Sequence, residues 1–206
     1  MSIRRTIANF TAGLVCLVLL LGGCSSGQNE AGISASRKLY NTAEALAKDS
    51  STIVRGRLGD AQARANDDGG GGKGQFSFPM VLYKLTVTSG KSASGRAPSE
   101  LTLAWIDTEK VPVDPSDAAP LTPGKDYVFF LEKVTEEQRG GLRGFGTICV
   151  PVSSNAGVFS IDQGKAIAAD KEMENVKPGG APQARIQGRM AVDPSALLAL
   201  APGRAD

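Results

Sequence analysis

Apolar and polar residues alternate with a period of two along much of the chain, and this pattern predicts short β-strands. The clearest case is residues 76–88, in which Val81, Tyr83 and Leu85 point to one side while Lys84 and other polar residues point to the other. Related patterns predict further strands at 51–58, 100–107, 126–134, 145–152, 157–161 and 165–168. Turn-forming residues separate these stretches, so the middle of the chain is predicted to be a mainly β domain.

Particular residues in these segments also predict a bulge, a central strand, a turn and a loop. Gly56 interrupts the first strand and predicts a β-bulge or a close strand crossing. Residues 126–134 begin apolar on both faces, which predicts a central strand. Asp162-Gln163-Gly164-Lys165 predicts a hairpin turn between the last two strands. The glycine run within 59–75 leads into a β pattern rather than a helix, so it predicts a flexible loop and not a phosphate cradle.

One helix is predicted before the first strand, over about residues 35–48, with Ser34 or Ser36 as its N-cap. Its apolar positions recur at i, i+4 and i+7: Leu39, Ala43 and Leu46. A single stripe of this size suits packing on a sheet. Binding of the helix to a membrane surface is the second interpretation, but such a helix favours a larger apolar face and more basic residues.

The C-terminal residues 170–206 are rich in proline, glycine and alanine and are predicted to form a weakly structured tail. Within this tail, Asp193 followed by Pro194 predicts a short helix over 194–201, because aspartate caps helices and proline suits the first helical position. The predicted fold class is therefore mainly β: a small antiparallel barrel or sandwich with one N-terminal helix and a short C-terminal helix.

The N-terminus has the three-part pattern of a secretory signal. Arg4 and Arg5 precede an apolar run, and the small residues Gly22 and Gly23 follow it. The mostly apolar stretch 10–23 holds fourteen residues, whereas a membrane-spanning helix needs roughly 20. We therefore expect a cleaved signal peptide over residues 1–23 rather than a permanent transmembrane helix.

The end of this signal, Leu21-Gly22-Gly23-Cys24, resembles the lipobox of bacterial lipoproteins. The resemblance implies S-diacylglyceryl transfer to the Cys24 thiol and cleavage between Gly23 and Cys24, and it leaves open whether the new N-terminus is also acylated. It implies a lipid-anchored protein on the extracytoplasmic side of a cell membrane. Small polar residues over 24–33 predict a flexible tether, followed by a β-rich domain over 34–169. An ordinary cleaved signal with a chance cysteine is the alternative.

Charge and composition narrow the possible functions. Removal of residues 1–23 takes the chain from 23 basic and 21 acidic residues to 21 of each, so the mature chain is neutral and lacks an electrostatic footprint for nucleic acid. The absence of histidine excludes Ser-His-Asp and Cys-His catalysis and His-based zinc sites. We expect no metal and no cofactor. Cys149 lies between Ile148 and Val150, which predicts a buried core residue; a reactive thiol is the alternative.

Residues 43–168 also resemble small secreted bacterial domains with an OB-like barrel. The resemblance rests on the order of segments such as Ile-Val-Arg-Gly-Arg-Leu at 53–58 and Pro-Gly-Lys-Asp-Tyr-Val-Phe-Phe-Leu at 123–131. Many such domains have no assigned activity, so the resemblance implies a fold and no particular reaction.

Three functions follow as hypotheses. The first is a non-catalytic binding or scaffolding module, held at the bilayer by acylated Cys24, that contacts an envelope protein, a glycan or another ligand. The second is an envelope hydrolase that uses carboxylates or a Ser-Lys pair. Its candidate acids share one proline-rich loop: Asp107, Glu109, Asp114 and Asp117. The third is an inhibitor of an envelope enzyme. The missing histidine-based catalytic sets favour the first.

Overall fold

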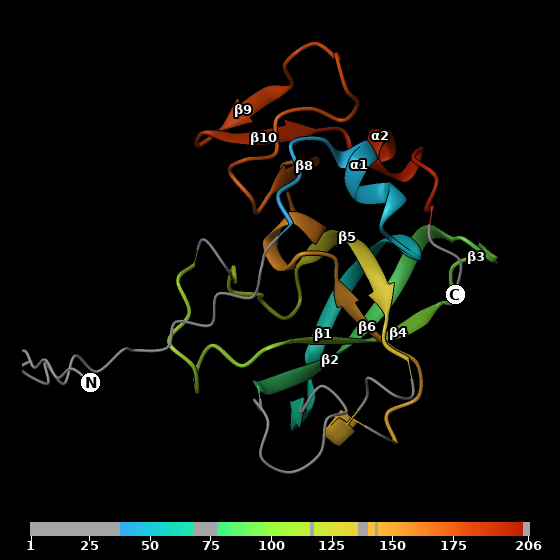
Figure 1. Ribbon diagram of the computed structural model, residues 1–206, viewed down its shortest axis with the longest axis vertical. Helices are drawn as coiled ribbons and strands as arrows, with labels where there is room; N and C mark the ends of the chain where they lie inside the picture. Colours follow the sequence, from blue (N-terminus) through green and yellow to red (C-terminus); the bar gives the residue numbers. More distant parts are fainter. Residues whose placement is uncertain (1–37, 68–77, 116–117, 136–139, 143, 204–206) are drawn as a thin grey trace, which may run out of the picture. The chain divides into compact units, whose positions relative to one another are not determined.

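Ten strands form one mixed sheet in the computed structural model, which describes residues 38–67, 78–115, 118–135, 140–142 and 144–203 (Figure 1). All of these residues belong to one unit, Ile33–Asp206. The strands are β1 (Thr52–Asp67), β2 (Phe78–Ser92), β3 (Gly95–Arg96), β4 (Glu100–Ile106), β5 (Asp126–Lys133), β6 (Ile148–Pro151), β7 (Val158–Asp162), β8 (Lys165–Ala168), β9 (Ala184–Ile186) and β10 (Arg189–Val192). The predicted mainly β fold is confirmed.

Five of these strands pair in a ring-like order, β1–β2–β4–β6–β5, and β5 pairs with β1 again. The pairings around the ring are antiparallel except for β4–β6, where Thr102 lies opposite Ile148 in a parallel register. The sequence predicts an antiparallel barrel or sandwich, and the mixed sheet corrects this detail. Neighbouring strands cannot all be antiparallel around a ring with an odd number of members. The ring-like order loosely fits the predicted OB-like barrel.

β5 is the central strand, as its two apolar faces predict. One of its edges pairs with β1, and the other pairs with β7 near the start of the strand and with β6 near its end. Val128 and Phe130 belong to one buried cluster, whereas Tyr127, Phe129 and Leu131 belong to a second. β5 therefore joins the ring to a C-terminal part of the sheet with the order β7–β8–β10–β9.

Two predicted local features are confirmed. The pairing of β1 with β2 shifts register between Arg55 and Gly56, and a Cβ on Gly56 would lie 2.6 Å from the Thr86 carbonyl oxygen. A side chain does not fit there, which explains the glycine at the bulge. β7 and β8 form the predicted hairpin, with φ angles of 47° at Gln163 and 75° at Gly164. Positive φ at both central residues is what a tight two-residue hairpin turn requires.

β1 and β2 extend beyond the predicted strands. Residues 59–67, which the sequence assigns to a loop, continue β1 and pair with β2 as far as Asp67 opposite Phe78. Backbone hydrogen bonds hold this part of the ladder, so its polar side chains show no apolar pattern that would predict it. The glycine run at 69–72 lies outside the described residues.

β2 and β4 have two different faces. The first face packs inside the second cluster, called here the ring cluster, through residues that include Tyr83, Leu85, Leu101, Leu103 and Trp105. Part of the opposite face is covered by a third cluster, which includes Met80, Leu82, Ala104, Leu142 and Ile148. Leu142 comes from the short 3-10 helix η1 (Gly140–Leu142). Further along this outer face, Lys84 lies opposite Thr102, and the surface becomes polar.

Helix α1 spans Ala43–Lys48 and is shorter than the helix predicted over 35–48. The Thr42 hydroxyl caps it by accepting a hydrogen bond from the Ala45 N–H at 3.2 Å. The two serines predicted as caps lie outside the described residues. Leu39, predicted to belong to the apolar stripe, is 68% exposed because it precedes the helix and does not reach the core. No helix within the described ranges is long and apolar enough to cross a membrane.

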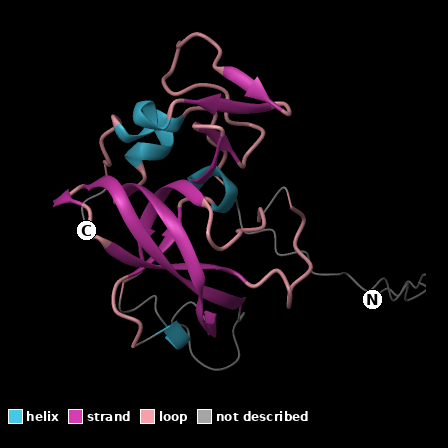
Figure 2. Ribbon diagram, turned by 180° about the vertical axis from the view of Figure 1, so that it is seen from behind, coloured by secondary structure: helices cyan, strands magenta, loops and turns pink. Residues whose placement is uncertain are grey.

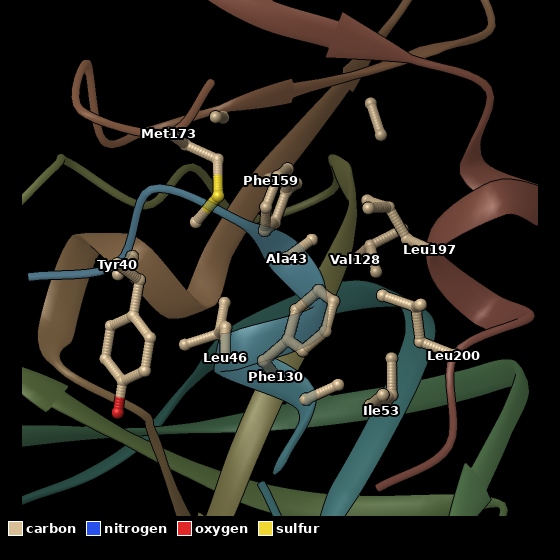
Figure 3. Packing of buried hydrophobic residues seen from close by; sticks show 14 of the residues in the cluster. Tyr40, Ala43, Leu46, Ile53, Val128, Phe130, Phe159, Met173, Leu197 and Leu200 are labelled. Carbon is tan, nitrogen blue, oxygen red and sulfur yellow. The ribbon is translucent and has the colours of Figure 1, made fainter. Parts of the chain in front are cut away.

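The C-terminal segment is more ordered than its sequence predicts. β10 pairs with β8 and β9 pairs with β10, and α2 (Pro194–Leu198) begins with Asp193 as the predicted cap. Figures 1 and 2 both show α1 and α2 side by side. Side chains from both helices and from β5 form the first cluster, called here the helix cluster (Figure 3); it includes Leu46, Phe130, Phe159, Met173, Leu197 and Leu200.

Candidate functional site

Two of the acids predicted as catalytic candidates, Asp107 and Glu109, lie together after β4, where Arg64 joins them. The Arg64 guanidinium lies 3.0 Å from Asp107 Oδ2 and 2.6 Å from Glu109 Oε2. The Asp107 side chain is 1% exposed, whereas the side chains of Arg64 and Glu109 are 41% and 75% exposed. Arg64 therefore bridges a buried carboxylate to an exposed one.

The turn that follows β4 holds Asp107 in place. Its N–H donates to the Pro79 carbonyl at 2.8 Å, and its own carbonyl accepts the N–H groups of Lys110 and Val111 at 3.0 Å each. Its Oδ1 also accepts the Glu109 N–H at 3.3 Å. The carboxylate is thus fixed by its own turn on one side and by the guanidinium on the other.

The other two acids of this loop are Asp114 and Asp117. Asp114 is exposed, and its carbonyl accepts the Ala118 N–H at 3.1 Å. Asp117 lies outside the described residues. Arg64 was not predicted as a partner because the sequence places it in a loop, whereas the structure places it on β1.

The geometry of the cluster favours a structural role. A carboxylate-based glycosidase needs one protonated acid and one charged carboxylate, but here both carboxylates contact a single guanidinium, which is the geometry of an ion-pair bridge. Burial raises the pKa of the nearby Tyr83 phenol, while Arg64 opposes that shift. Tyr83 is therefore neutral at pH 7 and adds no further anion. The cluster ties β1 to the loop after β4.

A buried asparagine fixes the same loop from the other side. Asn155 lies in η2 (Ser154–Gly157) and is 0% exposed. Its Oδ1 accepts the Ala119 N–H at 2.6 Å, and its Nδ2 donates to the Pro115 carbonyl at 3.1 Å. These partners are 36 and 40 residues away in the chain. No pattern around Asn155 predicts this role, because only the folded chain brings the two segments together.

A polar pocket of about 240 Å³ lies on the outer face of β2 and β4. Its lining residues are Gln62, Lys84, Pro98, Glu100, Leu101, Thr102 and Thr147. Lys84 Nζ lies 2.6 Å from Glu100 Oε1, and the Thr102 hydroxyl donates to the Phe145 carbonyl at 3.3 Å. The lining comes from β1, β2, β4 and the segments that precede β4 and β6, so the sequence alone did not predict this pocket.

The predicted lipidation site lies elsewhere. Cys24 and Gly23 are outside the described residues, so the lipid modification and the cleavage remain predictions. Cys149 is 2% exposed in the ring cluster, and the predicted core position is confirmed. Within the part of the chain that the structure describes, no group of three or more cysteine, aspartate or glutamate side chains is placed to hold a metal ion.

Comparison with models of protein families, with curated proteins and with solved structures finds no match for this chain.

Proposed function

We propose that this chain is a lipid-anchored envelope protein whose β domain binds a ligand without chemical turnover. The anchor is Cys24, which acquires a diacylglyceryl group and becomes the first residue of the mature chain. The domain then lies on the extracytoplasmic side of the membrane. This part of the proposal is supported by Leu21-Gly22-Gly23-Cys24 at the end of a signal-like N-terminus.

The polar pocket on β2 and β4 is the observation that carries the binding role. Most of its lining residues have polar side chains that can form hydrogen bonds with a polar ligand. Two of the four acids that suggested a hydrolase, Asp107 and Glu109, instead contact Arg64, and the buried Asp107 is engaged by its own turn. These contacts favour a structural role for Asp107 and Glu109, so the polar pocket supports a binding role.

Metabolic labelling tests the anchor. Cells that express the full chain should incorporate labelled palmitate into it, and Cys24→Ala should abolish the label and release the protein from membranes or leave the precursor uncleaved. Cys16→Ala is the matched control, because it removes another cysteine of the same signal and should leave labelling intact. Failure of the wild-type chain to incorporate palmitate would contradict the lipid anchor.

Incubation of the purified full chain with glycan and peptide substrates tests the absence of turnover. We expect no product. Turnover by the wild-type chain that is lost in Glu109→Gln would refute the non-catalytic role and favour a carboxylate hydrolase. Glu109 suits this test because its side chain is 75% exposed, so the substitution should leave the fold intact.

A further inference from the structure

We infer that the polar pocket on the outer face of β2 and β4 binds one unit of a neutral saccharide. This inference rests on the binding role proposed above and names its ligand class. The pocket lies where the third cluster ends and the outer face becomes polar. The sheet provides the floor, and Thr147, from the segment before β6, provides part of the rim.

The charges of the pocket disfavour an ionic ligand. Lys84 and Glu100 form an ion pair at 2.6 Å, so the titratable side chains of the lining carry no net charge. An anion would have to displace Glu100 from Lys84 and would be repelled by the carboxylate. A cation would have to displace Lys84 from Glu100 and would be repelled by the ammonium. A ligand without charge can accept from the ammonium and donate to the carboxylate while the ion pair stays in place.

The remaining lining favours hydroxyl groups over an aromatic or acyl ligand. Gln62 and the Thr147 hydroxyl each offer a donor and an acceptor, and the Thr102 hydroxyl, which donates to the Phe145 carbonyl, still offers an acceptor. The lining contains no aromatic ring, and of its two apolar residues Leu101 packs its side chain into the ring cluster, which leaves Pro98 as the apolar surface. A sugar ring matches this set, because each of its hydroxyls can donate and accept and its C–H groups can lie against Pro98.

The size of the pocket favours one unit of a larger chain. A volume of about 240 Å³ is below the roughly 300–1,000 Å³ of sites that enclose a drug-sized ligand. The rim residues Gln62 and Thr147 are exposed, so the pocket is open on one side and a polymer can continue across the sheet. Recognition of a single unit through a small contact area implies weak, fast-exchanging binding.

NMR titration of the isotope-labelled full chain in detergent micelles tests this inference. The probes are maltotriose and chitotriose, with inorganic phosphate and glucuronate as charged comparisons. Either neutral sugar should shift the amide signals of Thr102 and Thr147 and bind more tightly than the anions. Gln62→Ala and Thr147→Val should each weaken sugar binding by about three- to tenfold, since each removes hydrogen bonds to the ligand.

Matched controls separate the pocket from the rest of the surface. Gln183→Ala and Thr88→Val change a half-buried and an exposed residue of the same types outside the pocket lining and should leave the affinity unchanged. The inference is overturned if neither sugar shifts pocket signals at roughly 10 mM, an upper limit for weak specific recognition by so small a site, or if phosphate binds as tightly. Palmitate labelling reports on the lipid anchor and the NMR titration reports on the pocket, so failure of the anchor and failure of sugar binding are distinguished.

Discussion

Replacement of Asn155 by alanine should loosen the loop between β4 and β5. The substitution removes the Asn155 hydrogen bonds to the Ala119 N–H and to the Pro115 carbonyl, which join η2 to this loop. Asn155 is 0% exposed, so water does not replace the side chain while the loop stays closed. The loop then either keeps a buried N–H without a partner or opens.

The magnitude follows from the two partners. A buried group left without its hydrogen bond costs about 1–3 kcal/mol, and a hydrogen bond whose partner can reach water costs about 1 kcal/mol. Pro115 is exposed, so we assign the larger cost to the Ala119 N–H and the smaller one to the Pro115 carbonyl. The free energy of unfolding should fall by about 2–4 kcal/mol in total. At about 3 kcal/mol, the Tm of a domain of this size should fall by roughly 6–12 °C.

Urea unfolding of the full chain followed by tryptophan fluorescence measures this change, because Trp105 lies in the ring cluster next to the loop. Limited proteolysis should also cut the loop faster in the variant. Asn66→Ala is the matched control: Asn66 is exposed, and its removal should change the free energy of unfolding by less than about 0.5 kcal/mol. An Asn155→Ala variant as stable as this control, with an equally resistant loop, would refute the reasoning.

Asn155→Asp extends the test to pH. The new carboxylate keeps an acceptor for the Ala119 N–H but places a charge beside the Pro115 carbonyl, so at pH 7 the loss of stability should exceed that of Asn155→Ala. Burial at a fully buried position should raise the pKa of this new carboxyl in the folded state, so the folded state should bind the proton more tightly than the unfolded chain does. The extra loss should therefore shrink as the pH falls from the raised pKa toward about 4. A pH-independent difference between the two variants would contradict this account.

Three further outcomes are expected. Gly56→Val should destabilise the fold by about 1–3 kcal/mol in urea unfolding, because a Cβ there would lie 2.6 Å from a β2 carbonyl oxygen. Phe130→Ala should cost about 3–5 kcal/mol because Phe130 is 0% exposed, whereas Leu39→Ala, at a position 68% exposed, should be nearly neutral by the same assay. Hydrogen bonds from Ser195 lower the pKa of Asp193, so its contribution to α2 is complete above the usual aspartate pKa of about 4 and is lost as the pH falls through the lowered value. The protection of α2 amides relative to their intrinsic exchange rates should fall in acid for the wild type but change little for Asp193→Asn, which can still cap.

Most strands could be predicted because their signal is local. The alternation in β2, the two apolar faces of β5 and the turn at Gln163-Gly164 each depend on neighbours within a few residues. The same holds for the Asp193 cap of α2. Such features are set by backbone geometry and side-chain periodicity, which are properties of a short segment by itself.

The features that the sequence did not predict depend on contacts between distant segments of the chain. The second half of β1 is polar and is a strand because β2 pairs with it. α1 begins at Ala43 and not near residue 35. At this start, the N–H groups of Ala43 and Glu44 donate to carbonyls of the C-terminal segment at 3.0 and 2.8 Å. That segment is itself ordered because its scattered apolar residues, Met173 and Leu200 among them, enter a core that other elements supply.

The sequence by itself determined the predicted anchor, the mainly β class and the exclusion of histidine chemistry, since each depends on composition or on a short run of residues. Only the tertiary structure decided the candidate sites. It placed Arg64 between Asp107 and Glu109, Asn155 against a loop 36 residues away, and Lys84 beside Thr102 on a polar pocket. Strand pairing sets the neighbours on β1, β2 and β4, and the partner of a given strand is chosen by the packing of the whole sheet rather than by the strand's own residues.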